Sequence, residues 1–246
     1  MKLSVVIPAF NEESRLPATL GEAHAWLIEQ HGGETFEILV VDDGSTDATC
    51  ERVRALMSDM PELKLLEQSA NRGKGAAVRR GMLEAQGDIR LFMDADHSTH
   101  VNEAEKVLPA IAAGADVVIA SRQHPESDIT QHQSWLREHM GQGFNVLMRS
   151  MVGLDMQDTQ CGFKAFTAEA AEAIFSLQKL EGFSFDVEIL FLAHKLGFST
   201  LEIPVRWINE PNSKVRMLLD PLNMFIDLLR IRRMHRSDPE SQAAEK

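Results

Sequence analysis

Residues 91–99 read LFMDADHST, an apolar run that stops at two carboxylates, Asp94 and Asp96. If Leu91–Met93 is a buried parallel strand, both carboxylates emerge at its carboxyl end, where open α/β sheets bind ligands. Two hard oxygen donors at that place suit Mg²⁺ or Mn²⁺ bridging to a diphosphate. A strand that ends in an Asx turn without a metal has the same pattern. The flanking sequence has to decide between these two interpretations.

The stretch belongs to a regular alternation of strand and helix. Apolar, β-branched runs predict strands at 3–7, 36–41, 63–66, 89–93 and 116–120. Helical spacing of apolar residues predicts helices at 16–30, 73–85 and 102–113. Another helix follows Ser45 and Thr46, which we expect to cap it, and Gly32–Gly33 is expected to end the first helix. The alternation predicts an open, mostly parallel α/β sheet as far as about residue 122.

The second half of the chain has a less regular pattern. We expect helices at 135–152, 168–177 and 186–196, a short strand at 162–166 and an edge strand at 201–207. A last helix is predicted at 222–234, with Asn223, Asp227 and Arg230 as a narrow polar strip on a largely apolar surface. The polar residues 237–246 are expected to be disordered.

Composition and charge limit the classes of function. The chain has 246 residues, 44% of them hydrophobic, which is ample for one large α/β domain. A formal net charge of -12 argues against a general nucleic-acid surface, because phosphate backbones are bound by clustered Lys and Arg. The segment 214–236 is locally basic, which indicates a specific anionic partner.

The sequence also gives expectations about compartment. Cys50 and Cys161 are far apart and have no metal-ligand spacing, so a reducing cytoplasm is expected. The first strand starts at the N-terminus without the pattern of a signal peptide. No apolar run approaches the roughly 20 residues that span a bilayer. We therefore expect a cytoplasmic protein, soluble or peripheral on the cytoplasmic face of a membrane.

Two further strands end in acidic sequences. The strand predicted at 3–7 is followed by PAFNEE at 8–13, and the strand predicted at 36–41 is followed by DDGSTD at 42–47. Both ends are predicted at the same sheet edge as Asp94 and Asp96. Asp43 there can accept from a ribose hydroxyl or a base N–H. Helix N-capping is the alternative explanation of such residues.

A glycine-containing turn with a cation enters the helix at 73–85. Its sequence is NRGKGAA at 71–77, and Lys74 beside a helix N-terminus suits an anionic nucleotide. The P-loop pattern is absent, so this turn is not a P-loop. A plain turn that feeds a helix is the alternative.

Taken in order, these motifs resemble the glycosyltransferases of family two with the GT-A fold. The resemblance is carried by VVIPAFNE (5–12), VVDDGS (40–45), NRGKG (71–75), DAD (94–96), SR (121–122), DTQCGFK (158–164) and NSKV (212–215). The set is most similar to dolichyl-phosphate β-glucosyltransferases and next to dolichyl-phosphate mannose synthases. It covers essentially the whole chain.

The resemblance implies one GT-A domain at 1–215, with a nucleotide-sugar half at 1–122 and an acceptor half at 123–215. An amphipathic helix at 216–236, a candidate for the membrane interface, and the tail 237–246 follow it. It implies that Asp94 and Asp96 hold Mg²⁺ or Mn²⁺ on the sugar diphosphate. The expected substrate-binding residues are Pro8, Ala9, Phe10, Glu12, Asp43, Lys74, Asp94, Arg137, Ser213 and Lys214. The expected catalytic residues are Asp96, Asp158, Arg122 and Lys164.

The resemblance implies an inverting, metal-dependent transfer of a hexose, with glucose from UDP-glucose and a polyprenyl or dolichyl phosphate as the leading pair. Arg122, Lys164 and Lys214 are candidates for phosphate contacts, although lone cations are usually solvated. Asp158 is similar to the residue often assigned as base, yet a lipid phosphate is mostly ionised at neutral pH and needs no strong base. Asp158 would then position the acceptor or a cation such as Lys164.

Two departures from the pattern keep alternatives open. Mannose synthases usually have a Gln where Ser98 stands, which leaves a third metal ligand undecided and favours the glucosyl branch. Many relatives continue into membrane spans, whereas this chain stops after one amphipathic helix, which lies on a membrane or packs on protein. A soluble acceptor, a GDP-mannose donor, a sugar nucleotidyltransferase and a non-catalytic nucleotide-sugar binder are the competing functions. His97, His124 and His139 are not spaced as a metal set.

Overall fold

The computed structural model describes residues 2–31, 36–130, 156–208 and 219–236. The predicted helix at 135–152, the predicted end of the first helix at Gly32–Gly33 and the predicted disordered tail lie outside these residues. No helix among the described residues combines the length and the apolar character that crossing a membrane requires.

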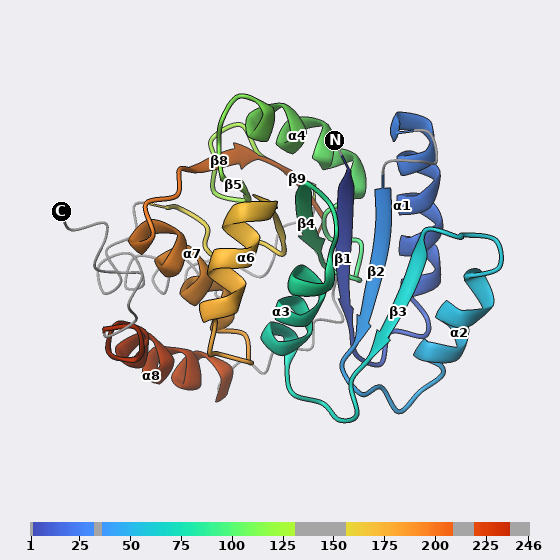
Figure 1. Cartoon of the computed structure of the whole chain (residues 1–246), viewed down its shortest axis with the longest axis horizontal. Coiled ribbons are helices and arrows are strands. Elements are labelled where there is room, and N and C mark those ends of the chain that lie inside the picture. The colour runs from blue at the N-terminus through green and yellow to red at the C-terminus, as the bar shows by residue number, and fades with distance from the viewer. Residues whose placement is uncertain (1, 32–35, 131–155, 209–218, 237–246) are drawn as a thin grey trace.

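A seven-stranded sheet forms the middle layer (Figure 1). Its spatial order is β3 (Leu63–Glu67), β2 (Phe36–Asp42), β1 (Leu3–Ala9), β4 (Ile89–Met93), β7 (Phe163–Thr167), β5 (Val117–Ser121) and β8 (Thr200–Pro204). β7 pairs antiparallel with both β4 and β5, and every other pair in this sheet is parallel. The predicted α/β class with a mostly parallel sheet is therefore confirmed.

Helices cover both faces of the sheet. One face carries α1 (Leu16–His31), α2 (Thr49–Leu56), the short 3₁₀ helix η1 (Val101–Glu103) and α4 (Ala104–Ala112). The other face carries α3 (Lys74–Glu84), α6 (Ala168–Leu177) and α7 (Phe185–Lys195), with α8 (Leu219–Met234) packed on α7 (Figure 1). Strand residues alternate between the two cores, as Val5 and Val6 do, because successive strand side chains point to opposite faces.

The single antiparallel strand joins distant motifs. Phe163 in β7 pairs with Met93 in β4, and Asp94 N–H donates to the Gly162 carbonyl over 3.0 Å. The start of β7 therefore meets the end of β4, which brings the motif at 158–164 beside the motif at 94–96. A Cβ on Gly162 would lie 2.0 Å from Asp94 Oδ2, so only glycine allows this approach.

Two sequence predictions need correction. Ser45 and Thr46 do not cap the second helix, because α2 begins at Thr49 with Asp47 Oδ1 accepting from the Thr49 N–H. Ser45 and Thr46 instead hydrogen-bond with Asn11 after β1, which ties the first two strand ends together. The predicted strand at 201–207 is divided: β8 closes the main sheet, whereas β9 (Arg206–Trp207) pairs with β6 (Asp128–Ile129) in a separate ribbon.

Candidate active site

The two carboxylates of Asp94 and Asp96 lie where β4 ends, and both residues are partly exposed. Their loop is held from two sides: Asp94 N–H donates to Gly162, and the Ala95 carbonyl accepts from Thr19 Oγ1 over 2.8 Å. Asp96 Oδ1 accepts from the Ser98 N–H at 3.1 Å, the Asx-type contact expected after a strand. The backbone is thus fixed while the carboxylates face the carboxyl edge of the sheet.

Lys74, the first residue of α3, places a cation on this pair. Its Nζ lies 2.5 Å from Asp94 Oδ1. Burial opposes the charge of Lys74, but Asp94, then Asp186 and Asp96, raise its pKa above the usual range. The predicted Lys74 and Asp94 therefore meet in one cluster, which stabilises positive charge. Carboxylate oxygens that already attract a cation are also the donor type that Mg²⁺ and Mn²⁺ prefer, so the residues fit a divalent metal.

Asp43 directly follows β2 and holds the turn before α3. Its Oδ1 accepts from Gln68 Nε2 at 2.7 Å and from the Arg72 N–H at 2.8 Å, and its Oδ2 accepts from the Gly73 N–H at 2.8 Å. Burial raises the pKa of Asp43 despite these bonds. Gly73 has a φ of 114°, which a residue with a side chain rarely adopts. Asp43 positions the turn that carries Lys74, and a direct contact with a nucleoside stays a prediction.

The segment after β1 lies against this turn. Ala9 pairs with Asp42 across the sheet, and its carbonyl accepts from the Asp43 N–H over 2.8 Å. Pro8 and Phe10 are half-buried at the same edge. Glu12 is buried and binds Arg15 through two bonds of 2.7 and 2.6 Å. The predicted nucleoside-binding residues are thus brought to one edge, with the Glu12 carboxylate engaged by Arg15.

Arg122, which is partly exposed, and the buried Asp158 form an ion pair beyond β5. Asp158 is fully buried and accepts from the Arg122 N–H at 2.9 Å, from Nε at 2.6 Å and from a terminal nitrogen at 2.8 Å. Burial by itself raises the pKa of Asp158, but the Arg122 guanidinium more than offsets it and holds the pKa below its usual value. The Arg122 guanidinium also lies 5.5 Å from the centre of the Trp207 ring. The cation that Asp158 positions is Arg122, not Lys164 as the sequence suggested.

The acid sensitivity of the fold should reflect this pair. Because the pKa of Asp158 is lower in the folded chain than the 3.8 of an unperturbed aspartate, its contribution to stability is complete above that value and is lost as pH falls through the folded pKa. The free energy of unfolding should therefore decrease as the pH is lowered below about 4. In Asp158→Asn the part of this decrease that comes from Asp158 should be absent. Urea unfolding from pH 7 to pH 3 measures the difference. Equal pH dependence of the two chains would contradict the assignment.

Lys164 is fully buried, unlike a surface phosphate ligand. Its Nζ donates to Asp186 Oδ1 over 2.5 Å and to the Cys161 carbonyl over 2.7 Å, and it lies 5.3 Å from the centre of the Phe92 ring. In this arrangement Lys164 joins β7 to the first turn of α7, and a direct phosphate contact stays a prediction. Burial raises the pKa of Cys161 to about 12, which keeps its thiol protonated and unsuited to nucleophilic attack.

Two acidic residues of the site were missed by sequence reasoning. Asp186 at the start of α7 pairs with Lys164, and Glu202 in β8 accepts from the Asp158 N–H over 2.9 Å. Neither residue lies in a motif, and the contacts span 22 and 44 positions, so no local signal indicates them. The predicted substrate-binding residues Arg137, Ser213 and Lys214 lie outside the described part of the chain.

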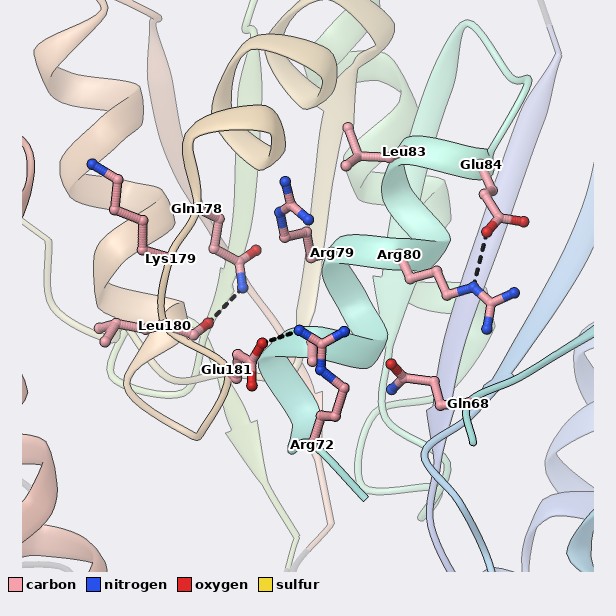
Figure 2. Close-up of a pocket in the computed structure, with 11 residues that line it drawn as sticks. Gln68, Arg72, Arg79, Arg80, Leu83, Glu84, Gln178, Lys179, Leu180 and Glu181 are labelled. Carbon is pink, nitrogen blue, oxygen red and sulfur yellow. Dashed lines mark hydrogen bonds and ion pairs between the residues drawn. The ribbon is translucent and has the colours of Figure 1, made fainter. Parts of the chain in front are cut away.

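A separate hollow of about 270 Å³ opens beside α3 (Figure 2). Its cations are already engaged: Arg72 binds Glu181, Arg80 binds Glu84, and Arg79 Nε donates to the Phe175 carbonyl at the end of α6. Arg79 thereby joins α3 to α6, and Arg72 joins the turn before α3 to the loop that follows α6. The hollow contains neither Asp94 nor Asp96. The better candidate for chemistry is therefore the strand-end cluster, formed by Asp94, Asp96 and Lys74 at the end of β4.

Comparison with known proteins gives consistent matches. The sequence model described as Glycosyl transferase family 2 matches residues 4–175. The dolichyl-phosphate β-glucosyltransferase of Dictyostelium discoideum is 38% identical over 240 residues, which covers 94% of this chain and 73% of that protein. The enzyme of the same name from Saccharomyces cerevisiae is 36% identical over 247 residues, with coverage of 94% and 74%.

Solved structures agree in fold. A mycobacterial protein matches with a TM-score of 0.68 and 20% identity, over 94% of this chain and 74% of that one. Glucosyl-3-phosphoglycerate synthase from Mycobacterium tuberculosis, in complex with Mn²⁺, UDP and phosphoglyceric acid, matches with a TM-score of 0.65 and 20% identity. That match covers 97% of this chain and 79% of the synthase.

Proposed function

The chain belongs to glycosyl transferase family 2 and is a glycosyltransferase, and from this premise we propose that it transfers glucose from UDP-glucose to a polyprenyl phosphate such as dolichyl phosphate. The expected family and the GT-A-type α/β fold are confirmed. The proposal depends above all on the strand-end cluster of Asp94, Asp96 and Lys74, in a chain whose curated relatives bear the name of that reaction.

On the donor side, Asp94 and Asp96 would hold a divalent metal. Such an ion acts as a Lewis acid that neutralises the departing diphosphate. In the present arrangement Lys74 neutralises Asp94. A metal on Asp94 would release the Lys74 ammonium, which would then be available to bind a phosphate oxygen of the same diphosphate. The Mn²⁺ and UDP bound by the structurally similar synthase support this assignment.

On the acceptor side, the reacting oxygen would arrive already charged. A phosphomonoester has a second pKa of about 6, so it is mostly ionised at neutral pH and needs little help from a base. Asp158 suits a positioning role rather than proton abstraction, because Arg122 holds its pKa low and occupies both carboxylate oxygens. Direct in-line attack on the anomeric carbon inverts the configuration, so a β-linked product is expected.

A transfer assay with two donors and three acceptors tests the proposal. UDP-glucose and GDP-mannose are each offered with a short polyprenyl phosphate, with the corresponding dephosphorylated alcohol and with a lipid-free buffer. We expect β-glucosyl transfer from UDP-glucose to the polyprenyl phosphate only. An α-linked product would refute the inverting mechanism, and preferential use of GDP-mannose or of a lipid-free acceptor would refute the donor or the acceptor assignment.

We also propose that α8 meets the membrane that carries such an acceptor, on its cytoplasmic face. One side of α8 packs on protein, where Ile231 and His235 are fully buried and His235 Nε2 lies 2.6 Å from Glu188 Oε1. Ile226 is 37% exposed and Leu229 is 57% exposed. Exposed arginines at 230, 232, 233 and 236 accompany them. Apolar side chains flanked by arginines suit an anionic membrane interface.

The membrane contact should depend on the exposed side of α8 alone. Replacing Ile226 and Leu229 by aspartate should lower co-sedimentation with anionic vesicles about tenfold or more, because two apolar side chains no longer enter the interface. Leu201→Asp, at a residue 45% exposed in β8, is the matched control and should bind as wild type does. Point variants are preferable to truncation, which would uncover the face of α7 that Ile231 covers. Equal binding by the double variant and wild type would exclude this contact.

A further inference from the structure

Three metal-ligating side chains converge beside the strand-end cluster but outside it. Glu22 projects from α1, and His97 and His100 lie in the loop between β4 and η1. Glu22 Oε2 lies 3.3 Å from His97 Nδ1 and 3.2 Å from His100 Nδ1. The ligand atoms of all three residues lie within 4.8 Å of one another. This group combines one carboxylate with two imidazoles, unlike the two carboxylates of Asp94 and Asp96.

The spacing fits a tetrahedral ion. Zinc binds histidine nitrogen at about 2.0–2.1 Å and carboxylate oxygen at about 2.0–2.2 Å, so two ligand atoms of a tetrahedral site lie about 3.4 Å apart. The two oxygen-to-nitrogen separations agree with that edge. The ligand atoms of the two histidines lie within 4.8 Å of each other, which completes a face of three ligand atoms. A single ion above this face would contact all three atoms and leave a fourth position for water.

The surroundings distinguish this group from an ordinary surface ion pair. The side chain of Glu22 is 58% exposed. Exposed ion pairs add little stability, so ion pairing alone is a weak reason for one carboxylate to contact two imidazole rings. His97 is buried on the side of its Nε2, which has no hydrogen-bond partner among the described residues, so its Nδ1 is the nitrogen that faces outward to a ligand. Both histidines direct Nδ1 to Glu22 Oε2, so the three ligand atoms face one common point.

We propose that Glu22, His97 and His100 bind one Zn²⁺ ion, separate from the metal on Asp94 and Asp96. Imidazole donors favour zinc, whereas carboxylate oxygens alone favour Mg²⁺ or Mn²⁺, so the two sites differ in ion preference. The ion would fasten α1 to the loop that follows Asp96, where the Thr19 contact with Ala95 already joins the same two elements. Zinc therefore braces the loop that presents the metal-binding carboxylates.

Calorimetric titration of the full chain with Zn²⁺ tests the site directly. Mg²⁺ is present in large excess to occupy Asp94 and Asp96. We expect one zinc per chain and, at zinc concentrations about 100-fold above the dissociation constant, a thermal midpoint raised by about 5–10 °C. Glu22→Gln and His100→Ala should each weaken binding at least about tenfold. His194→Ala, which removes an exposed histidine of α7 outside the group, is the matched control and should bind as wild type does.

Co²⁺ provides a second readout that does not depend on stability or activity. In a tetrahedral site with nitrogen donors it should give intense visible absorption, which His100→Ala should abolish and Asp96→Asn should keep. The proposal is overturned if wild type shows no saturable zinc binding, or if His100→Ala binds with wild-type affinity. It is also overturned if Asp96→Asn loses the ion while His100→Ala retains it, because the ion would then occupy the diphosphate site.

Discussion

Asp96→Ala is expected to lower kcat/KM for sugar transfer about 10³-fold or more while leaving the fold intact. The carboxylate is one of two proposed ligands of the ion that neutralises the leaving diphosphate, and such an ion supplies several kcal/mol of charge stabilisation. Within the described structure its hydrogen bond is the local contact with the Ser98 N–H, so little stability depends on it. Steady-state transfer assays with matched thermal unfolding curves measure both quantities, and removal of metal by EDTA should reproduce the loss.

Asp158→Asn should be less damaging to turnover than Asp96→Ala. The amide keeps one acceptor for Arg122 and preserves the shape of the buried pair, and the proposed acceptor needs no strong base. Asp59→Ala, which removes an exposed carboxylate in the turn after α2, serves as a control that should retain full activity. A larger loss at Asp158 than at Asp96, with both variants folded, would show that Asp158 takes part in the chemistry directly.

Gly162→Ala is the second substitution with a large expected effect. The added Cβ would lie 2.0 Å from Asp94 Oδ2 and 2.3 Å from Asp94 Cγ, so the carboxylate must move. A displacement of about 1 Å at a catalytic group can cost about 10²-fold in rate. We expect kcat/KM to fall by about that factor and the metal concentration at half-maximal activity to rise.

Gly21→Ala in α1 is the matched control for Gly162→Ala. A Cβ there meets nothing within 4 Å, and alanine is the better helix former by about 1 kcal/mol. This variant should keep full activity and unfold at a slightly higher temperature. If Gly162→Ala retained wild-type kcat/KM and metal dependence, the close contact between β7 and Asp94 would have no part in catalysis.

Local sequence patterns were sufficient to predict most helices and strands. Apolar periodicity located β1, β2, β4, α3 and α6 to within two residues, because each buries a face whose spacing the sequence displays directly. The capping of α2 was predicted wrongly, since Ser45 and Thr46 satisfy Asn11 across the strand ends instead of the helix. The local sequence around Ser45 and Thr46 is compatible both with capping a helix and with bridging two loops, so it does not distinguish the two roles.

Contacts between residues far apart in the chain could not be predicted from the sequence. The motifs predicted which residues gather at the sheet edge, yet the order of strands was needed to show that Gly162 touches Asp94. Asp158 was expected to position the acceptor or a cation such as Lys164. Its partner is instead Arg122, 36 positions away, while Lys164 binds Asp186. Charge pairing depends on which side chains share a buried volume, and spacing along the chain does not specify that. The Glu22, His97 and His100 group was missed for the same reason.

The place of β7 also constrains how the molecule assembles. β5 is synthesised before β7, yet in the sheet β7 lies between β4 and β5. β5 therefore cannot join the first four strands until a segment about forty residues further along has entered the gap. Such a non-local step is slow, because the chain entropy of the intervening loop is lost before any contact compensates for it. A nascent chain that has emerged from the ribosome only as far as about residue 122 would hold β5 without its β7 neighbour, and completion of the fold should await the emergence of β7.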